Sequence, residues 1–386
     1  MSTQRRNIAV VFGTRPDTIK MAPIILELQK HSQFKVTTIA TAQHRQMLDQ
    51  VLEVFDIHPD FDLNIMQPKQ SLATLTQNTV AALDEVLVET RPDMVLVQGD
   101  TTTTFVGSLA AFYRQIPVGH VEAGLRTQDK ANPFPEEINR RLTSCIADLH
   151  FAPTSTAKKA LLAENIRKDH IVVTGNSVID ALAYAIKKEY SFPDDRLNQF
   201  VKEDRQIILL TMHRRENWGK PMTGACEAVK VLAARYPAFR FVFPVHLNPI
   251  VREVVYPILG KLKNVLLIEP LPYSDFVNLM ARSHLILTDS GGVQEEGPSL
   301  GKPILVLRKV TERPEAVEYG TVKLVGLDPA AIISAARTLL DNPRAYKKMA
   351  TATNPYGDGK ASRRTIQALE YFFGLSTKKP TEFRPR

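Results

Sequence analysis

Cysteine is scarce in this chain of 386 residues, which contains only Cys145 and Cys226. The two lie on segments that are expected to belong to different domains, and the sequence has no Cys-x-x-Cys and no His-x-x-x-His pattern. These absences argue against a disulfide framework and against a zinc site. Both cysteines are expected to be small core residues, and no metal or other cofactor is expected.

Long apolar runs are also missing. No run approaches the roughly 18 apolar residues that a membrane span needs, and the polar start at residues 1–6 lacks the apolar core of a signal peptide. We therefore expect a cytoplasmic protein with no membrane partner.

The positive charge of the chain is spread out. The formal net charge is +8, but lysine and arginine are not gathered into a run that would indicate a nucleic-acid partner. A diffuse positive field suits a small anionic substrate. A local excess of positive charge occurs at residues 378–386, which are expected to form a disordered end.

What the sequence does contain is a regular alternation of short apolar runs and amphipathic segments. Helical patterns such as 21–31, 72–90 and 330–340 lie between or after the runs, which is typical of parallel α/β sheets. A chain of 386 residues is longer than one hydrophobic core usually accommodates, so we expect two domains. We predict two doubly wound (Rossmann-like) domains that face a central cleft, with a boundary near residue 176. The predicted strands are 8–13, 36–41, 94–98, 118–121, 149–152, 171–174, 207–212, 241–245, 265–268, 285–288, 304–307 and 322–325.

Two familiar nucleotide-binding patterns can be set aside. The segment 297–303, GPSLGKP, resembles a P-loop, but its glycines are one residue too close and Pro303 replaces the Ser or Thr that would hold magnesium. A turn into the next strand is expected there. No Gly-x-Gly-x-x-Gly follows a predicted strand, which argues against a bound dinucleotide.

The most informative local pattern is residues 288–296, TDSGGVQEE, which follow an apolar run. A strand that ends in Ser290, Gly291 and Gly292 and turns into a helix presents unpaired backbone N–H groups, which favour phosphate. Glu296 lies one helical turn further on, where a carboxylate can accept hydrogen bonds from sugar hydroxyls. The segment indicates a nucleotide bound through phosphate and ribose, and the alternative is a tight turn that caps its own helix.

The other polar residues at strand ends form an acidic group and a cationic group. The acidic residues are Asp100, Glu122 and Glu136, and the cationic residues are Arg15, Lys20, Arg140, His213, Arg214 and Arg313. Carboxylates held close together raise at least one pKa, which suits general acid or base catalysis near neutral pH. Structural alternatives exist for four residues: a helix cap for Asp100, an ion pair with Arg140 for Glu136, a buried ion pair with Arg126 for Glu122, and a core position for His213.

Seven motifs in order along the chain carry a resemblance to a known family. They are 13–16 (GTRP), 98–103 (QGDTTT), 120–127 (HVEAGLRT), 135–140 (PEEINR), 213–217 (HRREN), 290–296 (SGGVQEE) and 311–315 (TERPE). Together they resemble the non-hydrolysing UDP-N-acetylglucosamine 2-epimerase family, from about residue 8 to about residue 359.

The resemblance implies a glycosyltransferase-B architecture, usually as a homodimer, with the last helix crossing back to the first domain. We therefore expect an N-terminal domain of residues 1–176 plus 366–386 and a C-terminal domain of residues 177–365. The implied activity interconverts UDP-N-acetylglucosamine and UDP-N-acetylmannosamine in the cytoplasm, supplying precursors for cell-surface polysaccharide. The UDP-sugar is the implied partner.

The resemblance also implies roles for single residues. Asp100, Glu122, Glu136 and His213 are expected to be catalytic. The residues expected to bind substrate are Arg15, Lys20, Arg140, Arg214, Leu271, Phe276, Ser290, Gly291, Gly292, Glu296 and Arg313. Some bacterial members of the family need UDP-N-acetylglucosamine as an allosteric activator. Gln43, His44, Gln46, Gln70 and His246 are compatible with such a site, whereas Lys69 stands where an arginine helps to hold the activator.

The chemistry of the sugar favours one mechanism. The C2 hydrogen has no ring carbonyl beside it, so direct abstraction is prohibitively costly, and a detour through a ketone needs a dinucleotide. Elimination of UDP with loss of the C2 proton gives 2-acetamidoglucal, to which UDP adds back after reprotonation on the opposite face. The alternatives are a glycosyltransferase of the same architecture, a non-catalytic UDP-sugar sensor, and a relative that acts on a modified UDP-sugar.

Overall fold

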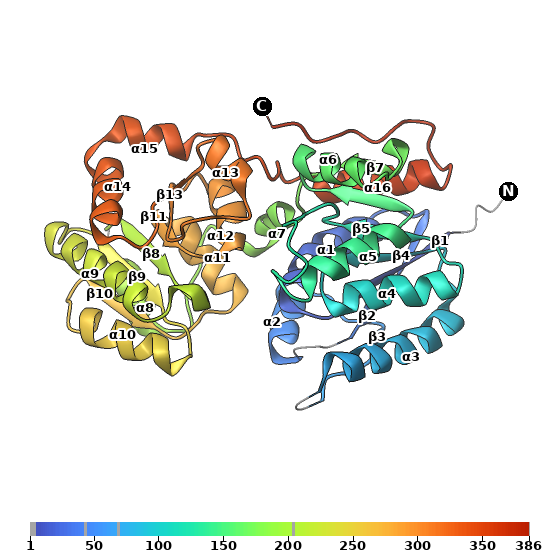
Figure 1. The fold of residues 1–386 in the computed structure, drawn as a ribbon, viewed down its shortest axis with the longest axis horizontal. Coiled ribbons are helices and arrows are strands. Elements are labelled where there is room, and N and C mark those ends of the chain that lie inside the picture. Colours follow the sequence, from blue (N-terminus) through green and yellow to red (C-terminus); the bar gives the residue numbers. More distant parts are fainter. Residues whose placement is uncertain (1–4, 42–44, 68–69, 203–204, 386) are drawn as a thin grey trace. The chain divides into compact units, whose positions relative to one another are not determined.

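The computed structural model describes residues 5–41, 45–67, 70–202 and 205–385, and gives only the backbone of residues 45–47. The chain forms two compact units, coloured by sequence in Figure 1. Unit 1 comprises Met1–Tyr184 and Tyr356–Pro385, and unit 2 comprises Ala185–Pro355. The domain limits expected from the resemblance, 176 and 366, stay a prediction.

Unit 1 is built on a parallel sheet that has seven strands within the described residues, in the order β3-β2-β1-β4-β5-β6-β7. The strands are β1 (Arg6–Phe12), β2 (Phe34–Ala40), β3 (Phe61–Asp62), β4 (Met94–Gln98), β5 (Val118–Val121), β6 (Leu149–Ala152) and β7 (Ile171–Val173). The strand order runs outward in both directions from β1 and β4, so the switch point lies between these two strands.

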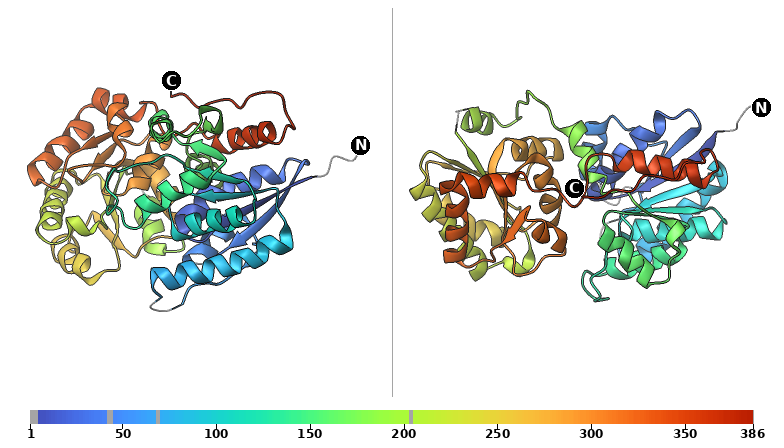
Figure 2. Two further views of the ribbon diagram at one scale, coloured as in Figure 1. Left: turned by 45° about the vertical axis from the view of Figure 1, so that its right-hand side comes forward. Right: turned by 90° about the horizontal axis from the view of Figure 1, so that it is seen from above.

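Helices cover both faces of this sheet. They are α1 (Arg15–Gln29), α2 (Arg45–Phe55), α3 (Leu72–Thr90), α4 (Thr102–Tyr113), α5 (Glu136–Ile146), α6 (Ser155–Ala163), η1 (Lys168–His170), α7 (Val178–Ala185) and α16 (Ala361–Phe372). Helix α1 packs against α2 and α16, whereas α4 packs between α3 and α5 on the other face (Figure 2). Because both faces are covered, the central strand β1 is apolar throughout Ile8–Phe12 and buried on both sides.

The C-terminal tail is ordered against unit 1, so the prediction of a disordered end was wrong. Phe383 is only 6% exposed, its backbone N–H donates to the Val173 carbonyl at 2.7 Å, and the Arg364 guanidinium lies 5.5 Å from its ring centre. The tail thereby covers the edge strand β7, and one buried aromatic residue anchors an otherwise basic and polar segment.

Unit 2 contains a second parallel sheet, in which the described residues form six strands in the order β10-β9-β8-β11-β12-β13. Its switch point lies between β8 and β11. The strands are β8 (Ile207–Thr211), β9 (Arg240–Pro244), β10 (Val265–Ile268), β11 (Ser283–Thr288), β12 (Ile304–Val306) and β13 (Val322–Leu324). The helices are α8 (Asp195–Lys202), η2 (Arg215–Asn217), α9 (Lys220–Arg235), α10 (Pro249–Leu259), α11 (Tyr273–Arg282), α12 (Gly291–Glu296), η3 (Gly297–Leu300), α13 (Pro314–Glu318), α14 (Pro329–Asp341) and α15 (Pro343–Ala350).

These elements confirm the α/β fold class with two doubly wound units. Each predicted strand is present, and the P-loop-like segment forms the turn η3 that leads into β12, as expected. Cys226 is buried in the core of unit 2, but Cys145 is exposed on α5, so its predicted core position was wrong. Within the described residues, no helix is long and apolar enough to cross a membrane, and no group of three or more His, Cys, Asp or Glu is arranged to hold a metal ion.

Candidate active site

The predicted polar residues of unit 1 lie where strands next to its switch point end. Arg15 opens α1 directly after β1, Asp100 follows β4, and Glu122 follows β5. The carboxyl ends of parallel strands meet at one edge of a sheet, which is where α/β folds bind ligands. Thus the fold brings Asp100, Glu122 and the start of α1 to one edge.

The turn between β1 and α1 is tightly built. A Cβ on Gly13 would lie 2.0 Å from the Thr41 hydroxyl oxygen, so only glycine fits. Asp17 accepts hydrogen bonds from the backbone N–H groups of Gly13, Thr14 and Thr18 at 3.1, 2.6 and 2.9 Å. Burial nevertheless raises the pKa of Asp17 to about 6. This carboxylate orders the backbone that carries Arg15.

Glu122 is held in place by three side-chain donors. Its Oε1 accepts from Lys20 Nζ at 2.6 Å and from Asn176 Nδ2 at 3.0 Å, and its Oε2 accepts from Gln98 Nε2. Its backbone adopts a φ of +63°, a left-handed conformation that costs free energy for a residue other than glycine. Arg126, the alternative partner, instead binds Glu164 at 2.8 and 2.7 Å, so that alternative was wrong.

Asp100 lies on a loop fixed from two sides. The His120 Nε2 is 2.7 Å from the Gly99 carbonyl, and Asn139 Nδ2 donates to the Asp100 carbonyl at 3.0 Å. Burial lowers the pKa of His120 to about 4, so the ring stays neutral and its Nε2–H donates to that carbonyl. The loop therefore has little freedom to move the Asp100 carboxylate.

The Asp100 carboxylate accepts a hydrogen bond from Arg140 Nη2. It does not cap α4, because the Thr101 side chain accepts from the Thr104 N–H, so the capping alternative was wrong. Burial raises the pKa of Asp100, and the charge of Glu122 raises it further, while Arg140 and Lys20 oppose the shift. Two interacting carboxylates with one raised pKa are suited to proton transfer near neutral pH.

Glu136, at the start of α5, is not paired with Arg140 as the alternative proposed. Arg140 instead contacts Asp100 and lies 3.5 Å from Glu137. The Glu136 Oε2 is buried and has no hydrogen-bond partner among the described residues. A buried carboxylate oxygen without a partner is costly, which marks this residue as one that a ligand could satisfy.

In unit 2, Asp289 organises the loop after β8. Its carboxylate, which is 0% exposed, accepts from the backbone N–H groups of His213 and Arg214 at 3.0 Å each, and from Asn217 Nδ2 at 2.9 Å. His213 Nδ1 lies 3.0 Å from the other carboxylate oxygen. Burial acts to raise the pKa of Asp289, but the hydrogen bonds from His213, Arg214 and Asn217 outweigh it and hold the pKa below its ordinary value.

His213 is therefore not a core histidine. Its side chain is 42% exposed, and its Nδ1 faces Asp289, which leaves Nε2 to point elsewhere. The Nε of the neighbouring Arg214 is buried without a partner among the described residues. The Arg214 guanidinium thus has a donor available beside the end of β11.

Helix α12 begins at Gly291, directly after Ser290, whose side chain makes no capping hydrogen bond. Capping of α12 by its own acidic residues stays an alternative. Neither glycine needs a left-handed backbone, and an added Cβ would lie 3.8 Å from Arg214 at Gly291 and 3.5 Å from Glu296 at Gly292. Because the backbone does not require glycine, the effect of these residues is to place no side chain beside the N–H groups of the turn.

The other predicted substrate-binding residues of unit 2 lie on or next to the helices α11, α12 and α13. Glu296 is 8% exposed and accepts from the Tyr273 hydroxyl at 3.3 Å. Arg313 donates to Glu295. Leu271 lies two residues before α11, and Phe276 is half-buried on that helix.

The predicted activator residues are only partly described. Gln43, His44 and Lys69 lie outside the described residues, and the side chain of Gln46 is not described. Gln70 accepts from the Gln67 N–H at 3.2 Å, and His246 Nδ1 accepts from the Asn248 N–H at 3.2 Å. Gln70 lies in unit 1 and His246 in unit 2, and activation stays a prediction.

Comparison with known proteins decides the family. The family model described as UDP-N-acetylglucosamine 2-epimerase matches residues 26–370. The chain belongs to the UDP-N-acetylglucosamine 2-epimerase family. It is 56% identical over 380 residues to the UDP-N-acetylglucosamine 2-epimerase of Bacillus subtilis, covering 98% of this chain and 99% of the relative.

Two solved structures of the family are also similar. The UDP-GlcNAc 2-epimerase of Neisseria meningitidis, solved bound to UDP-GlcNAc, shares 52% identity with a TM-score of 0.84, covering 95% of this chain and 100% of that one. The enzyme of Methanocaldococcus jannaschii, solved in complex with UDP-GlcNAc and UDP, shares 35% identity with a TM-score of 0.77, covering 95% and 99%. This epimerase-family chain therefore matches its relatives over nearly its whole length.

Three polar residues of this epimerase-family chain have roles that the sequence did not predict. Gln98 and Asn176 donate to Glu122, and Asp289 orders the loop that carries His213. Gln98 lies in the motif 98–103 and Asp289 in the pattern 288–296, so their position at strand ends was a usable signal. Asn176 lies 54 positions from Glu122 in the chain, and no local pattern could connect the two.

Asn176 is predicted to be a positioning residue for Glu122. Its Nδ2 donates to Glu122, whereas its Oδ1 accepts from the Val178 N–H at 3.1 Å. Asn176→Asp keeps the second contact and places a carboxylate against Glu122, so we expect kcat to fall about tenfold with little change in KM. Part of the loss should be recovered at lower pH, where one of the two carboxylates is protonated. A purely structural role predicts normal kcat for Asn176→Asp and a loss for Asn176→Ala, which removes both contacts.

Proposed function

We propose that the chain interconverts UDP-N-acetylglucosamine and UDP-N-acetylmannosamine by eliminating UDP and adding it back. The observation that carries this proposal is the pair of acids after neighbouring strands β4 and β5, since burial, and to a lesser degree the charge of Glu122, raises the pKa of Asp100. Coupled carboxylates can take a proton in one direction and return it in the other. Glu136, with its unpartnered buried oxygen, is the third acid of the set.

The reaction is balanced without an oxidant. A carboxylate takes the C2 proton as the bond between C1 and the UDP oxygen breaks, and UDP leaves with that electron pair. The C–H electrons form the C1–C2 double bond of 2-acetamidoglucal. A proton then returns to C2 from the opposite face, and UDP adds back to C1. The acids of unit 1 are the groups of this chain that can move both protons.

A departing diphosphate needs hydrogen-bond donors or positive groups, and unit 2 supplies candidates. The backbone N–H groups of Gly291 and Gly292 at the start of α12, together with Arg214, are donors of the right kind for an oxygen-rich anion, and the exposed His213 ring lies on the neighbouring loop. The family enzyme from Methanocaldococcus jannaschii, solved with UDP-GlcNAc and UDP, supports this class of ligand. Retaining UDP between the two half-reactions prevents loss of the glycal.

An isotope experiment tests the proposal. When the full chain is incubated with UDP-N-acetylglucosamine in heavy water, we expect deuterium at C2 of the recovered sugar nucleotide and the appearance of UDP-N-acetylmannosamine. Protein heated to denaturation is the control. The absence of both exchange and mannosamine product refutes the epimerase, and UDP release that depends on an acceptor, without exchange, indicates a glycosyltransferase.

The same heavy-water experiment with modified UDP-sugars tests the choice of substrate, since no described residue has been given a contact to C3 or C6 of the sugar. Faster C2 exchange with a 2,3-diacetamido uronic acid nucleotide than with UDP-N-acetylglucosamine would change the substrate but keep the mechanism. The homodimer and the cytoplasmic location implied by the family also stay predictions.

A further inference from the structure

A pocket of about 730 Å³ lies in unit 1, away from the candidate active site. Its floor includes Leu149, the first residue of β6, and Ile171 and Val172, the first residues of β7. The candidate catalytic residues follow the carboxyl ends of β4 and β5 in the same parallel sheet. The pocket is therefore at the opposite, amino-end edge of that sheet and cannot share a ligand with Asp100 and Glu122.

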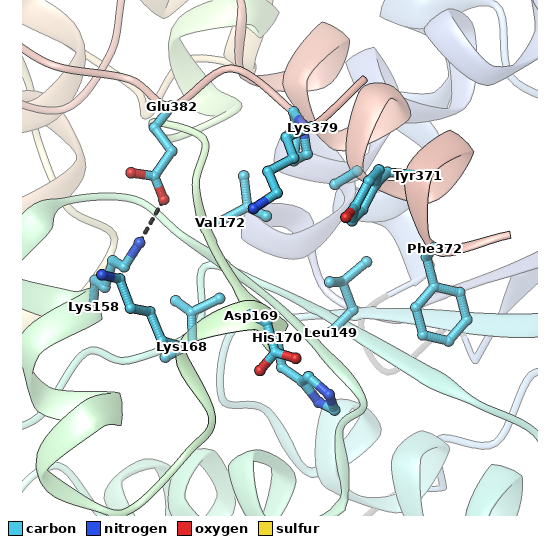
Figure 3. Close-up of a pocket in the computed structure, with 13 residues that line it drawn as sticks. Leu149, Lys158, Lys168, Asp169, His170, Val172, Tyr371, Phe372, Lys379 and Glu382 are labelled. Atoms are coloured by element: carbon cyan, nitrogen blue, oxygen red, sulfur yellow. Dashed lines mark hydrogen bonds and ion pairs between the residues drawn. The ribbon is translucent and has the colours of Figure 1, made fainter. Parts of the chain in front are cut away.

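Lysine side chains give this pocket an unbalanced positive charge. Lys158, Lys168 and Lys379 come from α6, η1 and the C-terminal tail, and all three line the hollow in Figure 3. Glu382 is already paired with Lys158 at 2.5 Å. In the part of the chain that the structure describes, Lys168 and Lys379 have no ion pair.

The acidic residue Asp169 does not neutralise them. Its carboxylate binds Arg167, which does not line the pocket, at 2.6 Å. Two ammonium groups thus remain for a ligand, which suits a phosphate monoester, with about two negative charges near neutral pH, better than a single carboxylate.

One wall of the pocket is aromatic. Tyr371 and Phe372 end α16 and remain 42% and 39% exposed, and Figure 3 shows both rings on the side opposite the Lys158–Glu382 ion pair. The apolar floor of Leu149, Ile171 and Val172 is itself buried. A flat apolar ring would cover this exposed aromatic surface.

We propose that this pocket binds a phosphorylated compound with an aromatic ring, of the nucleoside monophosphate class, with its phosphate at Lys168 and Lys379 and its ring at Tyr371 and Phe372. The size of the pocket agrees with such a ligand, because small-molecule sites usually measure about 300 to 1,000 Å³. The proposal does not depend on the epimerase reaction.

Calorimetric titration of the full chain with adenosine 5′-monophosphate, in saturating UDP to occupy the UDP-binding groups, tests the site. We expect binding that is about tenfold or more tighter than that of adenosine or inorganic phosphate under the same conditions. Binding of phosphate alone with equal affinity overturns the role of the ring. Equal binding of adenosine overturns the role of the lysines, and no binding below about 10 mM overturns the site itself.

Charge-matched variants locate the binding. Lys168→Glu combined with Lys379→Glu should weaken adenosine monophosphate binding by about tenfold or more. The control is Lys159→Glu combined with Lys378→Glu, which changes the net charge equally at exposed neighbours that do not line the pocket. Equal weakening in both double variants, or in neither, refutes the assignment. Tyr371→Ala should weaken the nucleotide but not phosphate, and since the ring is half exposed the fold should survive.

Discussion

Replacing Asp100 with asparagine is expected to lower kcat for epimerisation by about 10²-fold or more, while UDP affinity changes less than about threefold. Asparagine has nearly the same shape but cannot take up or release the proton. The raised pKa of Asp100, caused by burial and by Glu122, places its proton exchange closer to neutral pH than that of an exposed aspartate. Steady-state kinetics together with UDP titration measures both quantities.

Asp84→Asn is a matched control for this variant. Asp84 also accepts from an arginine, Arg114 Nε at 2.5 Å, and Arg114 lies at the C-terminal end of α4, whereas Asp100 precedes the N-terminal end. We expect kcat to stay within about twofold of the unchanged protein, because an exposed ion pair contributes little. If Asp100→Asn weakened UDP binding as much as it lowered kcat, Asp100 would be a scaffold residue and not a proton carrier.

The sheets could be predicted from the sequence because buried parallel strands are continuous apolar runs. Residues 94–98, 118–121 and 265–268 were predicted with the bounds that the structure has. Strand β3 was missed because it contains only Phe61–Asp62, too short for any periodicity. The ordered C-terminal tail was also missed because its apolar signal is short. The single aromatic residue Phe383 anchors a segment that otherwise consists mostly of charged and polar residues.

The pairing of the charged residues could not be predicted, because the sequence shows only local spacing. A separation of four suggests that Glu136 pairs with Arg140, yet Arg140 contacts Asp100, 40 positions away. Likewise Glu122 contacts Lys20, 102 positions away, and not the nearby Arg126. The strand order decides these contacts, since it brings the ends of β1, β4 and β5 together, and local ion pairs are too weak to compete with that geometry.

Replacing Asp289 with asparagine is the second change with a large expected effect. The Asp289 carboxylate accepts from the backbone of His213 and Arg214 and from the side chains of His213 and Asn217. An asparagine NH2 would face some of these donors and leave them unsatisfied, at a cost of about 1–3 kcal/mol. We expect a lower Tm together with UDP affinity weakened by about 10- to 100-fold, measured by thermal melting and calorimetry.

The pH dependence of stability gives an independent readout. The pKa of Asp289 is held below its ordinary value in the folded chain, so its ionised form stabilises the fold above the pKa of an unfolded aspartate. That contribution is lost as the pH falls through the folded-state pKa. Asp289→Asn should therefore remove part of the acid-induced loss of stability.

Two further variants separate loop order from direct contact with UDP. His213→Ala removes a side chain that is 42% exposed and one of the donors to Asp289. We expect UDP affinity to fall about tenfold, with a smaller loss of Tm than in Asp289→Asn, because the other donors to the carboxylate remain. Asp180→Asn, in unit 1, removes another buried carboxylate that accepts backbone N–H groups, those of Ala361 and Ser362 at 3.1 and 2.8 Å. It should lower Tm but leave UDP affinity unchanged. If His213→Ala kept normal UDP affinity while Asp289→Asn lost it, the backbone of the loop, and not the imidazole, would be the group that binds the diphosphate.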